Sequence, residues 1–140
     1  MKEIGLLNRE ISDAVTRMGH EDDLCICGAG FSIPLNIRDI DISLKDNKPG
    51  LMEVLKEILK YLPVEKVVIA KETKNVNPTM FNDIVKLFDE GVDIKIIPHL
   101  KLKRRCKDVK AIIRTGEFTA YSNLILISVA DEGRWIIENK

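Results

Sequence analysis

Residues 18–34 read MGHEDDLCICGAGFSIP, and the fold prediction starts from this stretch. It contains the end of a helix, a histidine at position 20, a short apolar run and a glycine-rich turn. Leu24 to Cys27 is apolar throughout, which is typical of a strand buried on both faces of a sheet. Gly28-Ala29-Gly30 then lets the backbone come close to a ligand or to another segment. A titratable ring beside such an open turn predicts an acid/base site.

Helix and strand signals alternate on both sides of this stretch. Apolar residues at 11, 14, 15 and 18 recur with helical spacing, and Asn8 can cap the start of that helix. Further on, strands are expected near 40–44, 67–70, 94–97, 109–113 and 124–129, with helices between them. Asp131-Glu132-Gly133 predicts a turn into a final hairpin strand at 134–138. The alternation predicts a single α/β domain over residues 1–140, with helices on both faces of a central sheet.

Val67 to Ala70 is apolar and β-branched, so we expect a central strand there. Lys71 to Lys74 follows at its carboxyl end, where open α/β sheets place ligand sites. Asn77-Pro78 predicts a cap followed by the first residue of a helix. The expected core contains Ile11, Val15, Leu55, Ile58, Val68, Ile84, Ile96, Ile112 and Ile125.

Composition excludes several classes of protein. The 140 residues carry 22 basic and 22 acidic side chains, a balance that argues against a nucleic-acid binder that works by neutralising phosphates. The apolar fraction of 45% fits an ordinary globular core, and no apolar run approaches the length of a membrane span. The N-terminus lacks the pattern of a signal peptide, so the predicted location is the cytoplasm.

Two further motifs in the sequence predict no catalytic or cofactor site. The three cysteines, at positions 25, 27 and 106, lack the spacing of a redox or zinc motif; we expect small buried hydrophobic residues, with a reactive thiol as the alternative. Gly28-Ala29-Gly30 after a strand is part of the dinucleotide fingerprint. That fingerprint needs a third glycine at the position of Ile33, so no nucleotide cofactor is predicted.

Four segments together resemble one known family. They are the opening stretch, Arg38-Asp39-Ile40-Asp41-Ile42-Ser43-Leu44, Lys71-Glu72-Thr73-Lys74 followed by Asn77, and Ile113-Arg114-Thr115-Gly116-Glu117-Phe118-Thr119-Ala120-Tyr121-Ser122-Asn123. Over roughly residues 4 to 128 the chain resembles the D-ribose pyranase family, the RbsD/FucU sugar pyranases and mutarotases. The resemblance implies a three-layer α/β/α sandwich and a monosaccharide substrate, with no metal or other cofactor. It also implies a ring-shaped homo-oligomer, a decamer of two stacked pentamers or a related ring, with sites between neighbouring subunits.

The resemblance also implies roles for particular residues. His20 would be the catalytic acid/base. His99 would bind the sugar, because it stands fifteen residues before Arg114 as the second histidine of the family does. Tyr121 and Asn123 would bind the sugar through their side chains, and Ser122 through its backbone. Each has an ordinary alternative: a capping or surface histidine, a rim tyrosine, a turn-forming asparagine. Glu117 is left open between a solvated charge and a residue that orients the site.

Position 28 departs from the family. Interconverting the ring forms of a sugar opens and recloses a hemiacetal, which needs a base near the anomeric hydroxyl and an acid near the ring oxygen. The family carries an aspartate, close to the histidine, where this chain has Gly28. Gly28 is still expected at the substrate-binding position, but it brings no carboxylate there. A catalytically impaired sugar-binding or regulatory relative is therefore the alternative hypothesis. A structural scaffold is a third hypothesis. Gly28→Asp is expected to raise activity, provided that the φ angle of the glycine is not positive.

Overall fold

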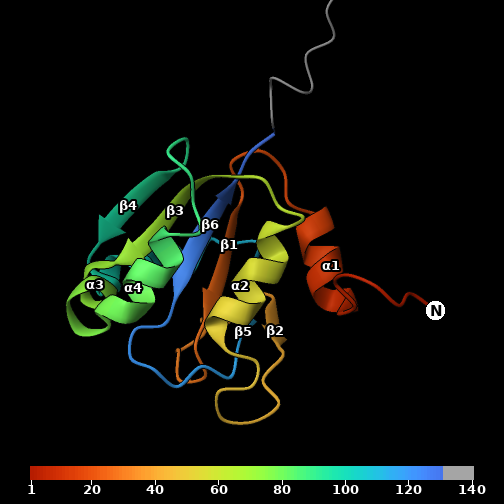
Figure 1. Cartoon of the computed structure of the whole chain (residues 1–140), viewed down its shortest axis with the longest axis horizontal. Helices are drawn as coiled ribbons and strands as arrows, with labels where there is room; N and C mark the ends of the chain where they lie inside the picture. Colours follow the sequence, from red (N-terminus) through yellow and green to blue (C-terminus); the bar gives the residue numbers. More distant parts are fainter. Residues whose placement is uncertain (131–140) are drawn as a thin grey trace, which may run out of the picture.

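The computed structural model describes residues 1–130, so the expected hairpin strand at 134–138 lies outside the described residues. Six strands form one sheet in the order β2-β5-β1-β6-β3-β4. Strand β6 is antiparallel to both of its neighbours, and the other adjacent pairs are parallel (Figure 1). The strands are β1 (Asp23–Cys27), β2 (Asp39–Asp41), β3 (Val64–Ala70), β4 (Asp93–Ile97), β5 (Ala111–Arg114) and β6 (Leu124–Ser128).

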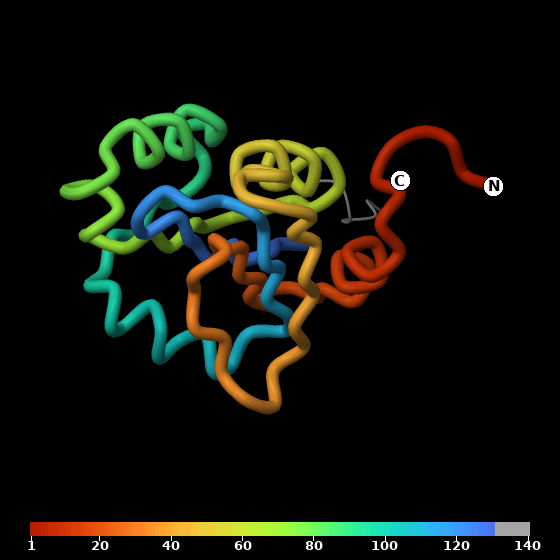
Figure 2. Tube along the Cα trace, turned by 90° about the horizontal axis from the view of Figure 1, so that it is seen from below, coloured from red at the N-terminus to blue at the C-terminus, as the bar shows by residue number. Residues whose placement is uncertain are grey.

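Helices cover both faces of the sheet, as predicted. Figure 2 shows α2 and α4 on one side of the sheet and α5 on the other. The helices are α1 (Arg9–Thr16), α2 (Leu51–Leu59), α3 (Lys71–Val76), α4 (Pro78–Val85) and α5 (His99–Arg105). This arrangement confirms the three-layer α/β/α prediction. None of the helices in residues 1–130 is both long enough and apolar enough to span a bilayer.

Strand β1 divides its side chains between two cores. Leu24 and Ile26 pack with residues of α1, α2 and α4, whereas Cys25 and Cys27 pack with residues of α5. All three cysteines are buried and free, which confirms that they act as small core residues. Burial raises the pKa of the Cys27 thiol to about 12, so this thiol stays protonated at neutral pH.

Most of the expected core is buried, with two differences. Strand β3 lies inside the sheet, between β6 and β4, as predicted for a central strand. Val15 is only partly buried. The prediction that Ile96 belongs to the core is wrong: Ile96 is 40% exposed because β4 is an edge strand. The helix start at Asn8 is confirmed, since its side chain accepts the Ile11 N–H at 2.9 Å.

The topology gathers several chain segments at one end of the sheet. The parallel strands β1, β3, β4 and β5 all end there, and the antiparallel β6 begins there. The turn after β1, the helices α3 and α5, and the loop from Thr115 to Asn123 are therefore neighbours. Figure 1 shows this loop at the opposite end of the sheet from the segment that leads into β1.

Candidate functional site

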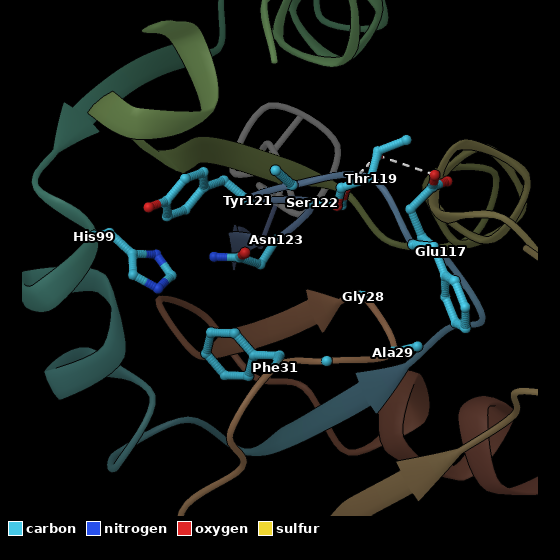
Figure 3. A pocket seen from close by; sticks show the side chains of 12 residues that line it. Gly28, Ala29, Phe31, His99, Glu117, Thr119, Tyr121, Ser122 and Asn123 are labelled. Carbon is cyan, nitrogen blue, oxygen red and sulfur yellow. Dashed lines mark hydrogen bonds between the residues drawn. The ribbon is translucent and has the colours of Figure 1, made fainter. Parts of the chain in front are cut away.

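A cavity of about 630 Å³ opens at this end of the sheet. Five of the six predicted site residues line it: Gly28, His99, Tyr121, Ser122 and Asn123 (Figure 3). They come from three segments that lie far apart in the sequence. The remaining lining residues are Ala29, Gly30, Phe31, Glu117, Phe118, Thr119 and Ala120.

Three rings form one wall of the cavity. The His99 ring meets the Tyr121 ring edge-on, with centroids 5.1 Å apart, and the Phe31 ring lies 6.2 Å away on its other side. Tyr121 has a φ of 54°, in the left-handed region that residues with a Cβ rarely adopt. Phe31 gave no signal in the sequence beyond its place after the glycine-rich turn.

Two polar atoms on the cavity lining are buried and unpaired. His99 Nδ1 and Asn123 Nδ2 have no hydrogen-bond partner among residues 1–130. Burial lowers the pKa of His99, so its imidazole is neutral at pH 7 and offers one donor and one acceptor nitrogen. Because buried polar groups are normally paired, these two atoms are unused hydrogen-bonding capacity in residues that line the cavity.

The opposite wall is built around the Glu117 carboxylate. Its Oε1 accepts the N–H of Leu51 at 3.0 Å, at the start of α2, and its Oε2 accepts the Thr119 hydroxyl at 3.0 Å. The Thr119 and Ser122 hydroxyl oxygens lie 2.6 Å apart, within hydrogen-bond distance. The Glu117 carboxylate is therefore hydrogen-bonded within the protein and connects the cavity loop to α2. That it orients the site stays a prediction.

Gly28 permits a close contact between two backbones. The Ala29 N–H donates to the Glu117 carbonyl at 2.9 Å, and a Cβ at position 28 would lie only 2.9 Å from that same oxygen. The φ of Gly28 is outside the left-handed region, so the backbone itself would accept aspartate. What opposes a side chain here is the space that the cavity loop occupies.

Arg114 holds the turn after β1 through two hydrogen bonds to its backbone. Its guanidinium donates from Nη1 to the Ala29 carbonyl at 2.7 Å and from Nη2 to the Phe31 carbonyl at 3.3 Å. The sequence predicted no role for Arg114 beyond its place in the motif and its spacing from His99. A charged residue at the end of the otherwise apolar β5 was the signal available.

His20 is the one predicted site residue outside the cavity. It precedes β1, whereas Gly28 follows it, and a strand of that length spans roughly 16 Å. His20 Nδ1 accepts the Ala130 N–H at 3.1 Å, and its Nε2 lies 3.7 Å from the Glu21 carboxylate. The sequence predicted that His20 lies beside the glycine-rich turn, and within one chain that prediction is wrong.

The fold and the cavity together define a small-molecule-binding α/β protein with its site at the strand ends. Residues 1–130 match the model of the RbsD / FucU transport protein family, and the chain belongs to that family. It is 42% identical to the D-ribose pyranase of Streptococcus uberis, over 91% of this chain and 97% of the relative. It is 44% identical to the D-ribose pyranase of Clostridium perfringens, with the same coverage.

Solved structures give the same grouping. Bacillus subtilis RbsD complexed with D-ribose has a TM-score of 0.88 and 36% identity, covering 93% of this chain and 98% of that one. The fucose mutarotase of Streptococcus pneumoniae in complex with L-fucose has a TM-score of 0.69 at 19% identity, covering 93% of this chain and 99% of that one, which shows a shared fold alone.

Proposed function

We propose that this protein is a sugar pyranase or mutarotase that interconverts ring forms of D-ribose or a related monosaccharide. The observation that carries the proposal is the cavity, which is lined by five residues selected from the sequence motifs, two of which carry an unpaired polar atom. The polar side chains suit sugar hydroxyls, and the ring wall suits the apolar face of a sugar. The D-ribose pyranase relatives and the ribose-bound neighbour support this choice of ligand.

The chemistry needs one proton donor and acceptor. The base takes the proton of the anomeric hydroxyl, the bond from the anomeric carbon to the ring oxygen breaks, and the ring oxygen receives a proton. Another hydroxyl of the open chain then gives up its proton and attacks the carbonyl carbon, the C=O π bond breaks, and the former carbonyl oxygen takes up a proton as the alternative ring closes. A single histidine can transfer these protons near neutral pH, and we assign this role to His20. The reaction consumes no cofactor.

His20 would act in the cavity of a second copy of the chain. It lies at the far end of β1 from the cavity, so it cannot reach a sugar bound by its own chain. We therefore propose a homo-oligomer, a ring such as the decamer that the sequence resemblance implies, in which each cavity receives His20 from a neighbour. The cytoplasmic location stays a prediction from the sequence.

Gly28 favours a second candidate function, a sugar-binding relative with impaired catalysis. A carboxylate at this position would stabilise the protonated histidine and accept sugar hydroxyls. In this chain the backbone carbonyl of Glu117 is close to the space that such a side chain would occupy. A carbonyl accepts hydrogen bonds but carries no negative charge, so binding can persist while proton transfer slows.

Saturation-transfer NMR on D-ribose separates the two candidates. A pyranase accelerates exchange between pyranose and furanose signals, whereas the impaired relative binds ribose without accelerating exchange. His20→Gln keeps an acceptor for the Ala130 N–H but cannot transfer a proton at neutral pH. It should slow enzyme-dependent exchange by about 10²–10⁴-fold. A wild-type protein that neither binds nor exchanges ribose or fucose would contradict both candidates.

A further inference from the structure

Helix α3 lies next to the cavity without lining it. Its Thr73 is fully buried and donates its hydroxyl hydrogen to the Tyr121 carbonyl at 2.7 Å. Tyr121 has the left-handed φ of 54°, a conformation that costs energy for a residue with a Cβ and persists only where neighbours hold it. The Thr73 contact is one such restraint, applied at the peptide that follows the Tyr121 Cα.

Asn77 applies a second restraint one peptide earlier. Its Nδ2 donates to the Ala120 carbonyl at 2.9 Å. Asn77 is the N-cap residue of α4 and Pro78 is the first helical residue, as predicted, but the Asn77 side chain makes no capping hydrogen bond to α4. The amide is directed to the cavity loop instead, so two consecutive carbonyls of that loop are held by donors that follow β3.

Glu72 reaches a different segment of the cavity. Its Oε2 accepts the backbone N–H of His99 at 2.8 Å, at the first residue of α5. His99 and Tyr121 are the two rings in edge-on contact at 5.1 Å. Helix α3 is therefore hydrogen-bonded to the backbone of both His99 and Tyr121, although these two residues belong to separate segments of the chain.

We infer that Glu72, Thr73 and Asn77 are positioning residues of the sugar site. They set the separation and orientation of His99 and Tyr121 through backbone contacts, and so they determine how well a monosaccharide is held. None of them is among the residues that line the cavity, so they would act through His99 and Tyr121. This inference rests on the proposed function for the identity of the ligand.

A positioning role and a merely structural role predict different measurements. Loss of a structural hydrogen bond lowers the melting temperature and leaves the affinity of the folded protein unchanged. Loss of a positioning contact weakens sugar binding even where the protein is fully folded, because a small misplacement of binding groups is costly. The separation of the two rings should also change in the absence of sugar.

The first test compares Thr73→Val with Thr73→Ser. Valine keeps the volume and removes the donor, whereas serine keeps the donor. We expect Thr73→Val to raise the Kd for D-ribose about tenfold, the value of one hydrogen bond, and Thr73→Ser to stay close to wild type. Ile11→Val, a core change on α1, controls for lost stability and should leave Kd unchanged. A wild-type Kd in folded Thr73→Val would overturn the inference.

A second pair of variants decides the matter if Thr73→Val fails to fold. Asn77→Asp removes the amide donor at nearly constant size from a position that is not fully buried. Asn75→Asp makes the same charge change at an exposed position of α3 and is its matched control. Asn77→Asp should raise the ribose Kd by a similar factor and Asn75→Asp should not. Equal Kd values for the two variants would contradict the positioning role.

The ring contact itself provides a readout that needs no sugar. Nuclear Overhauser transfer between the His99 and Tyr121 ring protons should weaken in Asn77→Asp and persist in Asn75→Asp. If wild type binds no sugar, the proposed function fails, and with it the ligand named here. An unchanged ring contact in a protein that does bind ribose overturns the positioning role alone.

Discussion

Gly28 is the residue at which two backbones meet in the cavity. A Cβ there would lie 2.9 Å from the Glu117 carbonyl, a contact that forces the loop to shift. We therefore expect Gly28→Ala to lower the melting temperature and weaken ribose binding. Gly28→Asp meets the same steric cost but restores a carboxylate, so its ring-exchange rate should exceed that of Gly28→Ala.

Gly28→Ala is the matched control for Gly28→Asp. It measures the steric cost alone, and the difference between the two variants measures the effect of the charge. Both belong in one exchange assay with wild type, at a saturating ribose concentration. A Gly28→Ala protein with wild-type stability and affinity would show that the loop moves aside freely.

His99 is predicted to make the protein less stable at mildly acidic pH. Burial lowers its pKa below the ordinary value of 6.5, so between the folded and unfolded pKa values the unfolded chain binds more protons. This contribution to stability is complete above pH 6.5 and is lost as the pH falls through that window. NMR titration of the His99 ring should give a midpoint below 6.5, and His99→Asn should reduce the acid sensitivity. A midpoint at or above the ordinary value would contradict the prediction.

Single residues were predictable where a motif fixed their identity. His99, Tyr121, Ser122 and Asn123 come together in the cavity as the motif spacing implied. The partners of Asn77 were not predictable, because an asparagine before a proline has a local role that explains it fully. Its actual partner is the Ala120 carbonyl, 43 positions away in the chain.

At the scale of elements, α2 depends on a cap from a distant loop. Its N-cap residue Gly50 has no side chain to cap with, and the first N–H of the helix donates to Glu117 instead. A carboxylate at a helix start also interacts favourably with the helix dipole. We expect Glu117→Ala to destabilise the protein by about 1 kcal/mol and lower its melting temperature by a few degrees.

Two further variants separate the causes. Glu117→Gln keeps the acceptor oxygen without the charge, so its melting temperature should lie between those of wild type and Glu117→Ala. Glu53→Ala removes an exposed carboxylate from the first turn of the same helix, and its effect should be smaller. If Glu53→Ala is as destabilising as Glu117→Ala, charge near the helix start matters and the cap does not.

The elements themselves were predictable to different degrees. β1, β3 and α1 carry strong local patterns of burial, and the structure has them where expected. α3 was missed as a helix because its six residues are too few to show an apolar stripe. Ile96 was assigned to the core because its strand is apolar, but strand order decides exposure, and sequence pattern does not encode that order directly.

At the scale of the whole molecule, the cavity and His20 lie at opposite ends of the sheet. Large apolar side chains are exposed on segments that follow strand ends at the cavity side: Leu35, Leu44, Leu100 and Phe118. His20 is displayed at the other end. A head-to-tail contact between these ends is heterologous, and a heterologous contact whose rotation closes generates a ring.

A mixing experiment tests whether the site is shared between chains. His20→Gln and Asn123→Ala should each be inactive, because one lacks the acid/base and the other a sugar-binding amide. In mixed oligomers, a cavity that takes His20 from a neighbour can combine the intact His20 of one chain with the intact Asn123 of the other. Random assembly of equal amounts would then restore about a quarter of the wild-type exchange activity.

The two variants are unfolded together, refolded together and compared with each variant refolded alone. Light scattering on the same samples checks that the oligomer has reformed. A reformed oligomer without recovered activity would mean that His20 and Asn123 do not act across the subunit boundary.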